Sequence, residues 1–150
     1  MGENLSFTFA VLLFTMLITS EAHHTRVTVK NEIRGENITA HCYSSEDDLG
    51  VRLLPSGKDF TWRFRVNFVH STKFYCDFKT KHGSGNYGVY TRKVHARCNK
   101  NCVWLIRETG LCLVQTNHSG HLWCQDWKIR PKSAVSTRRE YQTNAKMSLV

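Results

Sequence analysis

The chain has 150 residues, with 21 Lys and Arg against 12 Asp and Glu and a formal net charge of +9. This length is enough for one domain with a real hydrophobic core, which excludes a mini-protein in which disulfides replace the core. After the N-terminal region, no segment is apolar enough to hold the chain in a bilayer.

The N-terminus has the pattern of a secretory signal peptide. An apolar run over residues 5–18 is followed by Ser20-Glu21-Ala22, where small residues occupy the positions that cleavage requires. The run is shorter than the roughly 20 apolar residues of a membrane span, although no Lys or Arg precedes it. We therefore predict a signal peptide over residues 1–22, a secreted, extracellular mature chain that begins at His23, and no membrane insertion after cleavage.

Cleavage raises the net charge of the protein. Glu3 and Glu21 leave with the signal, so the mature chain keeps 21 basic and 10 acidic side chains, a net charge of +11. Strong positive charge often indicates a nucleic-acid partner, but export removes that partner and we expect none. An acidic polysaccharide or an acidic receptor face would be attracted in the same way. The alternative is that the charge serves only solubility.

Alternation of apolar and polar residues predicts a series of short strands. In residues 60–66, Phe60, Trp62 and Phe64 alternate with polar side chains, as in a half-buried strand. The other predicted strands are 27–33, 38–42, 74–78, 87–91, 102–107 and 111–115. Turn residues at 34–36, 55–57 and 108–110 separate them, and 81–86 reads as a flexible polar loop.

No stretch carries a sustained helical stripe with caps, so we predict an all-β fold. Short strands with regular turns are typical of a small antiparallel β-sandwich, here of about six to eight strands. We place this domain at residues 23–130. From residue 131 the chain is polar, basic and without periodicity, which predicts a disordered tail over 131–150.

Six cysteines follow the predicted cleavage site: Cys42, Cys76, Cys98, Cys102, Cys112 and Cys124. An even count in an exported chain predicts a fold stapled by three disulfides, whose pairing the sequence leaves open. Cys42 and Cys76 are in phase with the apolar residues of their strands, so their bridges should lie in or beside the core. Zinc is the alternative, because Cys98-x3-Cys102 is followed by Cys112, His118, His121 and Cys124. Zinc needs thiolates, which the secretory pathway oxidises, so we expect no metal and no cofactor.

Two sequons lie in the mature chain, Asn37-Ile38-Thr39 and Asn117-His118-Ser119. Asn37 falls on the polar face of its predicted strand and Asn117 in a predicted loop. We therefore predict N-glycosylation at both asparagines.

The acidic run Asp47-Asp48-Leu49-Gly50 has two interpretations. It could bind Ca²⁺ or a receptor, but two or three acids are fewer than the about six to eight oxygen ligands of Ca²⁺. An Asx-type turn, in which the side chains satisfy backbone amides, fits the residues better.

The histidines raise the question of a ribonuclease, which needs two of them as acid and base beside a cation. The candidates by residue type are His41, His70, His95, His118 and His121. They match no known secreted ribonuclease motif, and the sequence has no Gly-x-Ser-x-Gly elbow or evident pair of catalytic carboxylates. We predict no catalytic residues and no enzymatic activity.

Several motifs follow one another at a specific spacing. His41-Cys42-Tyr43 and the acidic turn come first, and Phe74-Tyr75-Cys76, Tyr87-Gly88-Val89-Tyr90 and Gly110-Leu111-Cys112 follow. In this order, over about Val27 to Trp127, the motifs resemble the plant self-incompatibility S-protein family, also called S-protein homologues. One departure is residues 78–80, where many members carry an aromatic pair around a tryptophan.

The resemblance implies a small secreted glycoprotein with a β-sandwich fold and no known enzymatic activity. It implies extracellular cell-cell signalling or recognition through an unidentified membrane receptor, as a stigmatic S-protein is recognised by a membrane protein on pollen. We expect a monomer. The alternatives are a secreted basic defence protein that binds acidic cell-wall polysaccharide or microbial surfaces, and a secreted ribonuclease.

A sandwich of this kind would present its loops to a partner. The candidate loops are 44–48, 69–73 and 80–86, and we favour the last because it is basic, rich in glycine and long. The residues predicted for receptor contact are Asp47, Asp48, Lys79, Lys81, His82 and Asn86.

Overall fold

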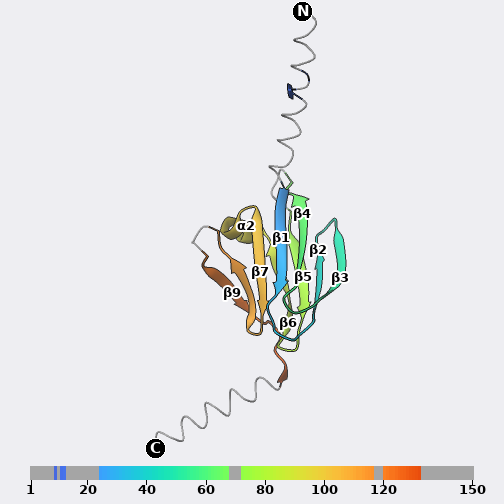
Figure 1. Cartoon of the computed structure of the whole chain (residues 1–150), viewed down its shortest axis with the longest axis vertical. Coiled ribbons are helices and arrows are strands. Elements are labelled where there is room, and N and C mark those ends of the chain that lie inside the picture. The colour runs from blue at the N-terminus through green and yellow to red at the C-terminus, as the bar shows by residue number, and fades with distance from the viewer. Residues whose placement is uncertain (1–8, 10, 13–23, 68–71, 117–119, 133–150) are drawn as a thin grey trace, which may run out of the picture.

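The computed structural model describes residues 9, 11–12, 24–67, 72–116 and 120–132 (Figure 1). Most of the predicted signal peptide, nearly all of the predicted tail and the predicted glycosylation site Asn117 lie outside these residues. The same is true of His70 and His118, and of most of the candidate loop 69–73.

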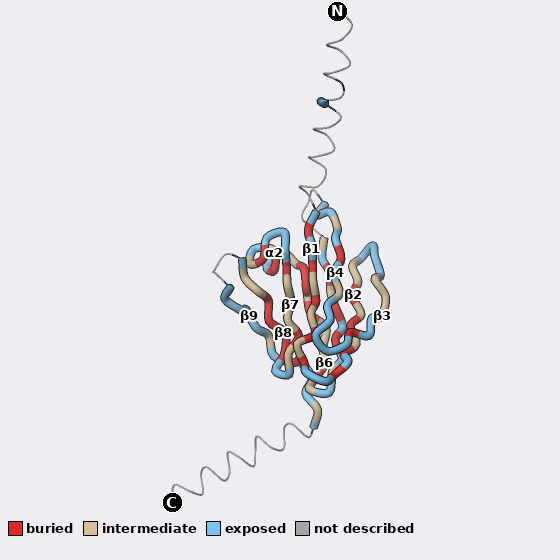
Figure 2. The backbone as a smooth tube through the Cα atoms, in the orientation of Figure 1, coloured by how far each residue is buried: buried red, intermediate tan, exposed pale blue. Residues whose placement is uncertain are grey.

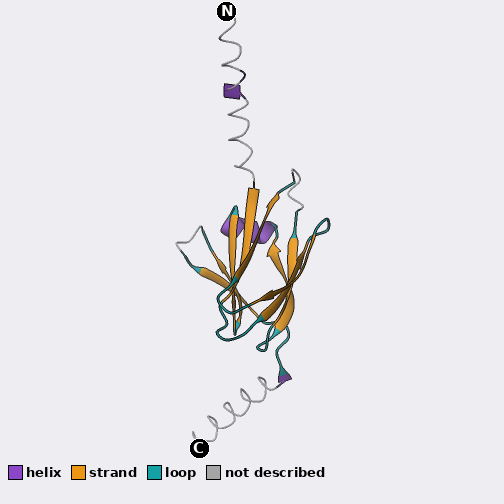
Figure 3. Ribbon diagram, turned by 45° about the vertical axis from the view of Figure 1, so that its right-hand side comes forward, coloured by secondary structure: helices purple, strands orange, loops and turns teal. Residues whose placement is uncertain are grey.

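Two β-sheets pack face to face (Figures 1 and 3). The five-stranded sheet has the order β4-β1-β7-β8-β9, and the four-stranded sheet has the order β3-β2-β5-β6. Neighbouring strands are antiparallel except β1 and β7, which are parallel. The bounds are β1 His24–Asn31, β2 Ile38–Tyr43, β3 Asp48–Leu54, β4 Asp59–Arg65, β5 Phe74–Lys79, β6 Ser84–Tyr90, α2 Arg92–Cys98, β7 Asn101–Arg107, β8 Gly110–Val114 and β9 Leu122–Asp126.

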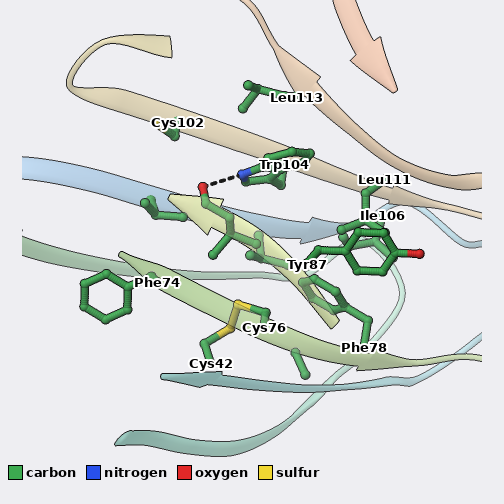
Figure 4. Packing of buried hydrophobic residues seen from close by; sticks show 14 of the residues in the cluster. Cys42, Phe74, Cys76, Phe78, Tyr87, Cys102, Trp104, Ile106, Leu111 and Leu113 are labelled. Atoms are coloured by element: carbon green, nitrogen blue, oxygen red, sulfur yellow. Dashed lines mark hydrogen bonds between the residues drawn. A yellow bond between two sulfur atoms is a disulfide. The ribbon is translucent and has the colours of Figure 1, made fainter. Parts of the chain in front are cut away.

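The core lies between the sheets and follows from alternation along the strands. In β1, Val27 and Val29 are fully buried, whereas Arg26, just before Val27, is exposed and Thr28, between the two valines, is half-buried. Buried positions recur along the inner strands, whereas the connecting loops and the edge strand β9 are mostly exposed or intermediate (Figure 2). The largest fully buried side chains include Trp104, Tyr87, Phe74, Phe78, Ile33, Ile38, Ile106, Leu111 and Leu113 (Figure 4).

Trp104 joins the two sheets. It belongs to β7 of the five-stranded sheet, and its indole Nε1 donates a hydrogen bond of 2.8 Å to the carbonyl oxygen of Val89 on β6 of the other sheet (Figure 4). A buried indole N–H needs a partner. This contact therefore helps to set how one sheet sits on the other.

Three disulfides staple the fold, as expected. Cys42–Cys76 joins directly opposed residues of β2 and β5, with Cα atoms 4.1 Å apart. Cys112–Cys124 joins β8 and β9 in the same way, with Cα atoms 4.0 Å apart. Cys98–Cys102 connects the end of α2 to the start of β7. The predicted disulfide-stapled, all-β sandwich is confirmed.

The structure also contains elements that the sequence pattern missed. The described residues form nine strands, because β3 and β9 add to the predicted set. A short helix, α2, follows β6; its N-cap Thr91 accepts a hydrogen bond from the amide of Val94, and only Val94 and Cys98 face the core. Residues 84–86 belong to β6, so the expectation of a flexible loop over 81–86 is wrong there.

Candidate functional site

The connecting segments gather at the two ends of the sandwich (Figure 1). We call the end that carries α2, the β2–β3 turn and the β4–β5 connection the α2 end. We call the end that carries the β5–β6 turn and the β7–β8 hairpin the hairpin end. Candidate loop 44–48 lies at the α2 end and 80–83 at the hairpin end, so the residues predicted for receptor contact do not form one cluster.

The β2–β3 turn at the α2 end is held by its own side chains. The hydroxyl Oγ of Ser44 accepts hydrogen bonds from the amides of Glu46 and Asp47, at 3.2 and 2.9 Å. The amide of Gly50 donates to Oδ1 of Asp48 at 2.8 Å, which is the Asx-type turn that the sequence indicated.

Asp48 and Asp47 differ in their contacts, although both are exposed. The Gly50 amide, and then Nε2 of His41 at 2.8 Å, lower the pKa of the Asp48 carboxyl because both favour its charged form. The carboxylate of Asp47 makes no hydrogen bond with another described residue, since only its backbone is engaged. Asp48 therefore has a structural role, and Asp47 is available to a partner.

The outer face of the four-stranded sheet is polar and aromatic. The rings of His41 and Tyr43 have centroids 5.3 Å apart, and those of Tyr43 and Tyr75 are 6.4 Å apart. Asn86 lies on β6 rather than in a loop, and its Nδ2 donates at 2.8 Å to the hydroxyl of Tyr43 and at 2.8 Å to Oδ1 of Asp77. The predicted contact residue Asn86 thus cross-links the sheet.

The β5–β6 connection is a tight turn over residues 80–83. The amide and hydroxyl of Thr80 donate to the carbonyl of Gly83 at 3.0 and 2.9 Å, and the hydroxyl accepts from the amide of His82. The buried carboxylate of Glu36 supports the turn, because it accepts from the amide of Lys81 and has Nε2 of His82 at 3.4 Å. Lys79 and Lys81 are exposed on either side.

A pocket that the sequence analysis did not identify opens at the α2 end. It has a volume of about 280 Å³ and is lined by Val66, Thr72, Tyr90, Thr91, Arg92 and His95. The available signal was the composition of residues 91–100, which hold Arg92, Lys93, His95, Arg97 and Lys100 and no acid. Because α2 was not predicted, this basic run did not indicate that a pocket lies beside it.

The structure also places the residues of the alternative interpretations. Of the candidate histidines, His41 pairs with Asp48 and His95 with the hydroxyl of Tyr90, so they have separate partners. His82, which was not a candidate, pairs with Glu36. The cysteines of the zinc alternative are all oxidised in disulfides, so its thiolates are absent.

Asn37 is exposed just before β2. In the part of the chain that the structure describes, no helix has both the length and the apolar character needed to cross a membrane.

Comparison with known proteins identifies the family. The model described as "Plant self-incompatibility protein S1" matches residues 26–127, from β1 to just past β9. "S-protein homolog 1" of Arabidopsis thaliana is 35% identical over 108 residues, covering 69% of this chain and 72% of the relative. "Self-incompatibility protein S1" of Papaver rhoeas is 35% identical over 99 residues, covering 63% of this chain and 66% of the relative. "S-protein homolog 74" of Arabidopsis thaliana is 36% identical over 107 residues, covering 69% and 71%. The chain belongs to the plant self-incompatibility protein S1 family.

Proposed function

We propose that this protein is a secreted, non-enzymatic glycoprotein ligand that acts in extracellular recognition through a membrane receptor. The observation that carries the proposal is the family match over residues 26–127, which runs from the third residue of β1 through β9. One of the relatives is named a self-incompatibility protein. Three disulfides in one small domain also suit an oxidising, extracellular compartment.

The mechanism we propose is display of exposed side chains on a rigid scaffold. Cross-strand disulfides and a close-packed core hold the strands in register, so little ordering entropy is lost when a partner binds. The β2–β3 turn is the favoured contact, because its backbone is fixed by Ser44 and Asp48 while the Asp47 carboxylate stays available. Lys79, Lys81 and His82 form a second candidate contact at the hairpin end.

The test compares two exposed carboxylates at opposite ends of the sandwich. Binding of labelled secreted protein to protoplasts would be measured for the wild type and for Asp47→Asn, with Glu108→Gln at the hairpin end as the charge-matched control. We expect Asp47→Asn to weaken binding about fivefold, the effect of roughly 1 kcal/mol from one interfacial ion pair, with the midpoint of unfolding unchanged. Equal affinity of Asp47→Asn and wild type would remove the β2–β3 turn from the contact.

A second candidate function is a basic defence protein that binds acidic wall or microbial surfaces. The mature charge of +11 favours it. Binding to anionic vesicles or to acidic wall polysaccharide at low salt would support this function if it were lost at physiological salt, where the Debye length is about 8 Å. A protein that ignores anionic surfaces at low salt would contradict it.

A further inference from the structure

The pocket at the α2 end differs in chemistry from an ordinary apolar ligand pocket. It is formed where β4 and β6 end and α2 begins, and among the described residues that line it Val66 is the only apolar aliphatic one. Tyr90 contributes a hydroxyl, two threonines contribute two more, and Arg92 and His95 contribute nitrogen donors. The described lining contains no acidic residue.

The walls of the pocket are held in place by contacts within the protein. Asn67 and Thr72 fix one wall, because the amide of Asn67 donates to Oγ1 of Thr72 at 3.0 Å and the amide of Thr72 donates to Oδ1 of Asn67 at 3.3 Å. Tyr90 and His95 fix the other, with Oη of Tyr90 3.1 Å from Nδ1 of His95. Tyr90 also packs edge-on against Phe64, with ring centroids 4.8 Å apart. A pocket with fixed walls loses little entropy when it binds a ligand.

The pocket also lies in a region of positive charge. The side chain of Arg92 is exposed and makes no hydrogen bond or ion pair with another described residue. Residues 91–100 contain no acid, and no ion pair among the described residues involves α2 or the pocket lining. The pairs join Glu32 with Lys30 and Arg107, Glu36 with His82, Asp48 with His41 and Asp126 with Arg130. Such a field raises the local concentration of an anion.

We propose that this pocket binds a carboxylated sugar residue of an acidic oligosaccharide, with the carboxylate on Arg92 and the ring hydroxyls on Thr72, Thr91 and His95. A guanidinium matches a carboxylate through two parallel hydrogen bonds. The volume of about 280 Å³ is near the lower limit of small-molecule sites, as a single sugar ring requires. Among the described lining residues, an apolar peptide side chain would contact only Val66 and the ring of Tyr90, so a polyhydroxylated anion is favoured over an acidic protein segment.

This inference goes beyond receptor recognition, since the pocket lining shares no residue with the β2–β3 turn, and it names a site for the acidic polysaccharide of the second candidate function. It is tested by titrating the full secreted protein with a short oligogalacturonate and following backbone amide signals by NMR. We expect saturable binding that shifts the signals of residues 90–95 and 72. Arg92→Gln should weaken binding about tenfold or more, as expected for a charge-assisted hydrogen bond. Arg92→Lys, which keeps the charge but loses the planar fork, should recover part of the affinity.

Two matched controls separate the pocket from the general positive field. Lys93→Gln removes the neighbouring cation on α2 outside the pocket lining, and Lys58→Gln removes one in the β3–β4 loop at the hairpin end. Both should change affinity less than about threefold, as distant or screened charges do. Equal losses in Arg92→Gln and Lys93→Gln would overturn the pocket assignment. Equal binding of a neutral galacto-oligosaccharide, or of poly-glutamate, would overturn the carboxylated sugar as ligand. None of these outcomes affects the Asp47 experiment on receptor binding.

Discussion

Trp104 shows how one side chain holds the two layers of the sandwich together. The Trp104→Phe substitution keeps an aromatic ring in the core but leaves the buried carbonyl of Val89 without its donor. We expect a loss of about 1–3 kcal/mol from the unsatisfied carbonyl, in addition to the lost packing. Urea unfolding measures this loss of stability. Trp123→Phe is the control, because Trp123 is only partly buried. Equal stability of the two variants would contradict the inter-sheet role of Trp104.

Two buried tyrosines predict a loss of stability at alkaline pH. Burial raises the pKa of Tyr87 and of Tyr90 above the ordinary value of 10.0. In the unfolded chain both ionise near pH 10, while in the folded protein they keep their protons, so the stabilising difference is complete below pH 10 and declines as the pH rises through the folded values. The free energy of unfolding should therefore fall above pH 10, and the Tyr87→Phe, Tyr90→Phe double variant should fall less steeply. If the free energy of unfolding falls equally steeply above pH 10 in the wild type and in the double variant, the two tyrosines are not the cause.

At this scale the sequence predicted which side chains face inward, because alternation alone decides it. Val27, Trp62 and Phe74 are buried as expected. It did not distinguish Asp47 from Asp48, because their difference depends on where the amide of Gly50 and the ring of His41 lie in the folded protein. It also did not reveal the hydrogen bond of Tyr90 to His95, which needs α2 in place.

At the scale of the elements, the disulfides differ in how much chain they restrict. Cys42–Cys76, Cys112–Cys124 and Cys98–Cys102 span sequence separations of 34, 12 and 4 residues. The loop-entropy description then predicts that paired Cys→Ala replacements cost about 4, 3 and 2 kcal/mol in that order. Chemical denaturation of the three double variants measures the order. A largest loss for Cys98–Cys102 would mean that local packing of α2 outweighs chain entropy.

The elements missed by sequence reasoning share a physical cause. α2 is seven residues long and buries only Val94 and Cys98, so it has too few turns for a helical period to emerge. β3 is an edge strand in which Val51 and Leu53 are exposed, so its apolar residues do not mark a buried face. β9 is also an edge strand and has no buried position. The pairing of the cysteines depends on strand register, such as Cys42 opposite Cys76, which the sequence does not specify.

At the scale of the whole molecule, the two ends of the sandwich carry different chemistry. The α2 end combines an available carboxylate at Asp47 with the cations of α2 and a polar pocket, and the hairpin end presents Lys79 and Lys81 beside a tight turn. The order and spacing of the motifs predicted the family and, through it, the sandwich fold, and both are confirmed. Order and spacing can be seen in the sequence without knowledge of the structure. The arrangement of the candidate residues at opposite ends followed only from the fold.

The most direct test of the account is the salt dependence of binding to cells. Labelled secreted protein would be titrated onto protoplasts at low and at physiological salt, with unlabelled protein as competitor. A receptor ligand should show saturable, competed binding that persists at physiological salt, where exposed charges are screened beyond about 8 Å. Binding that does not saturate and disappears as salt rises to the physiological level would contradict receptor recognition and favour attraction by charge alone.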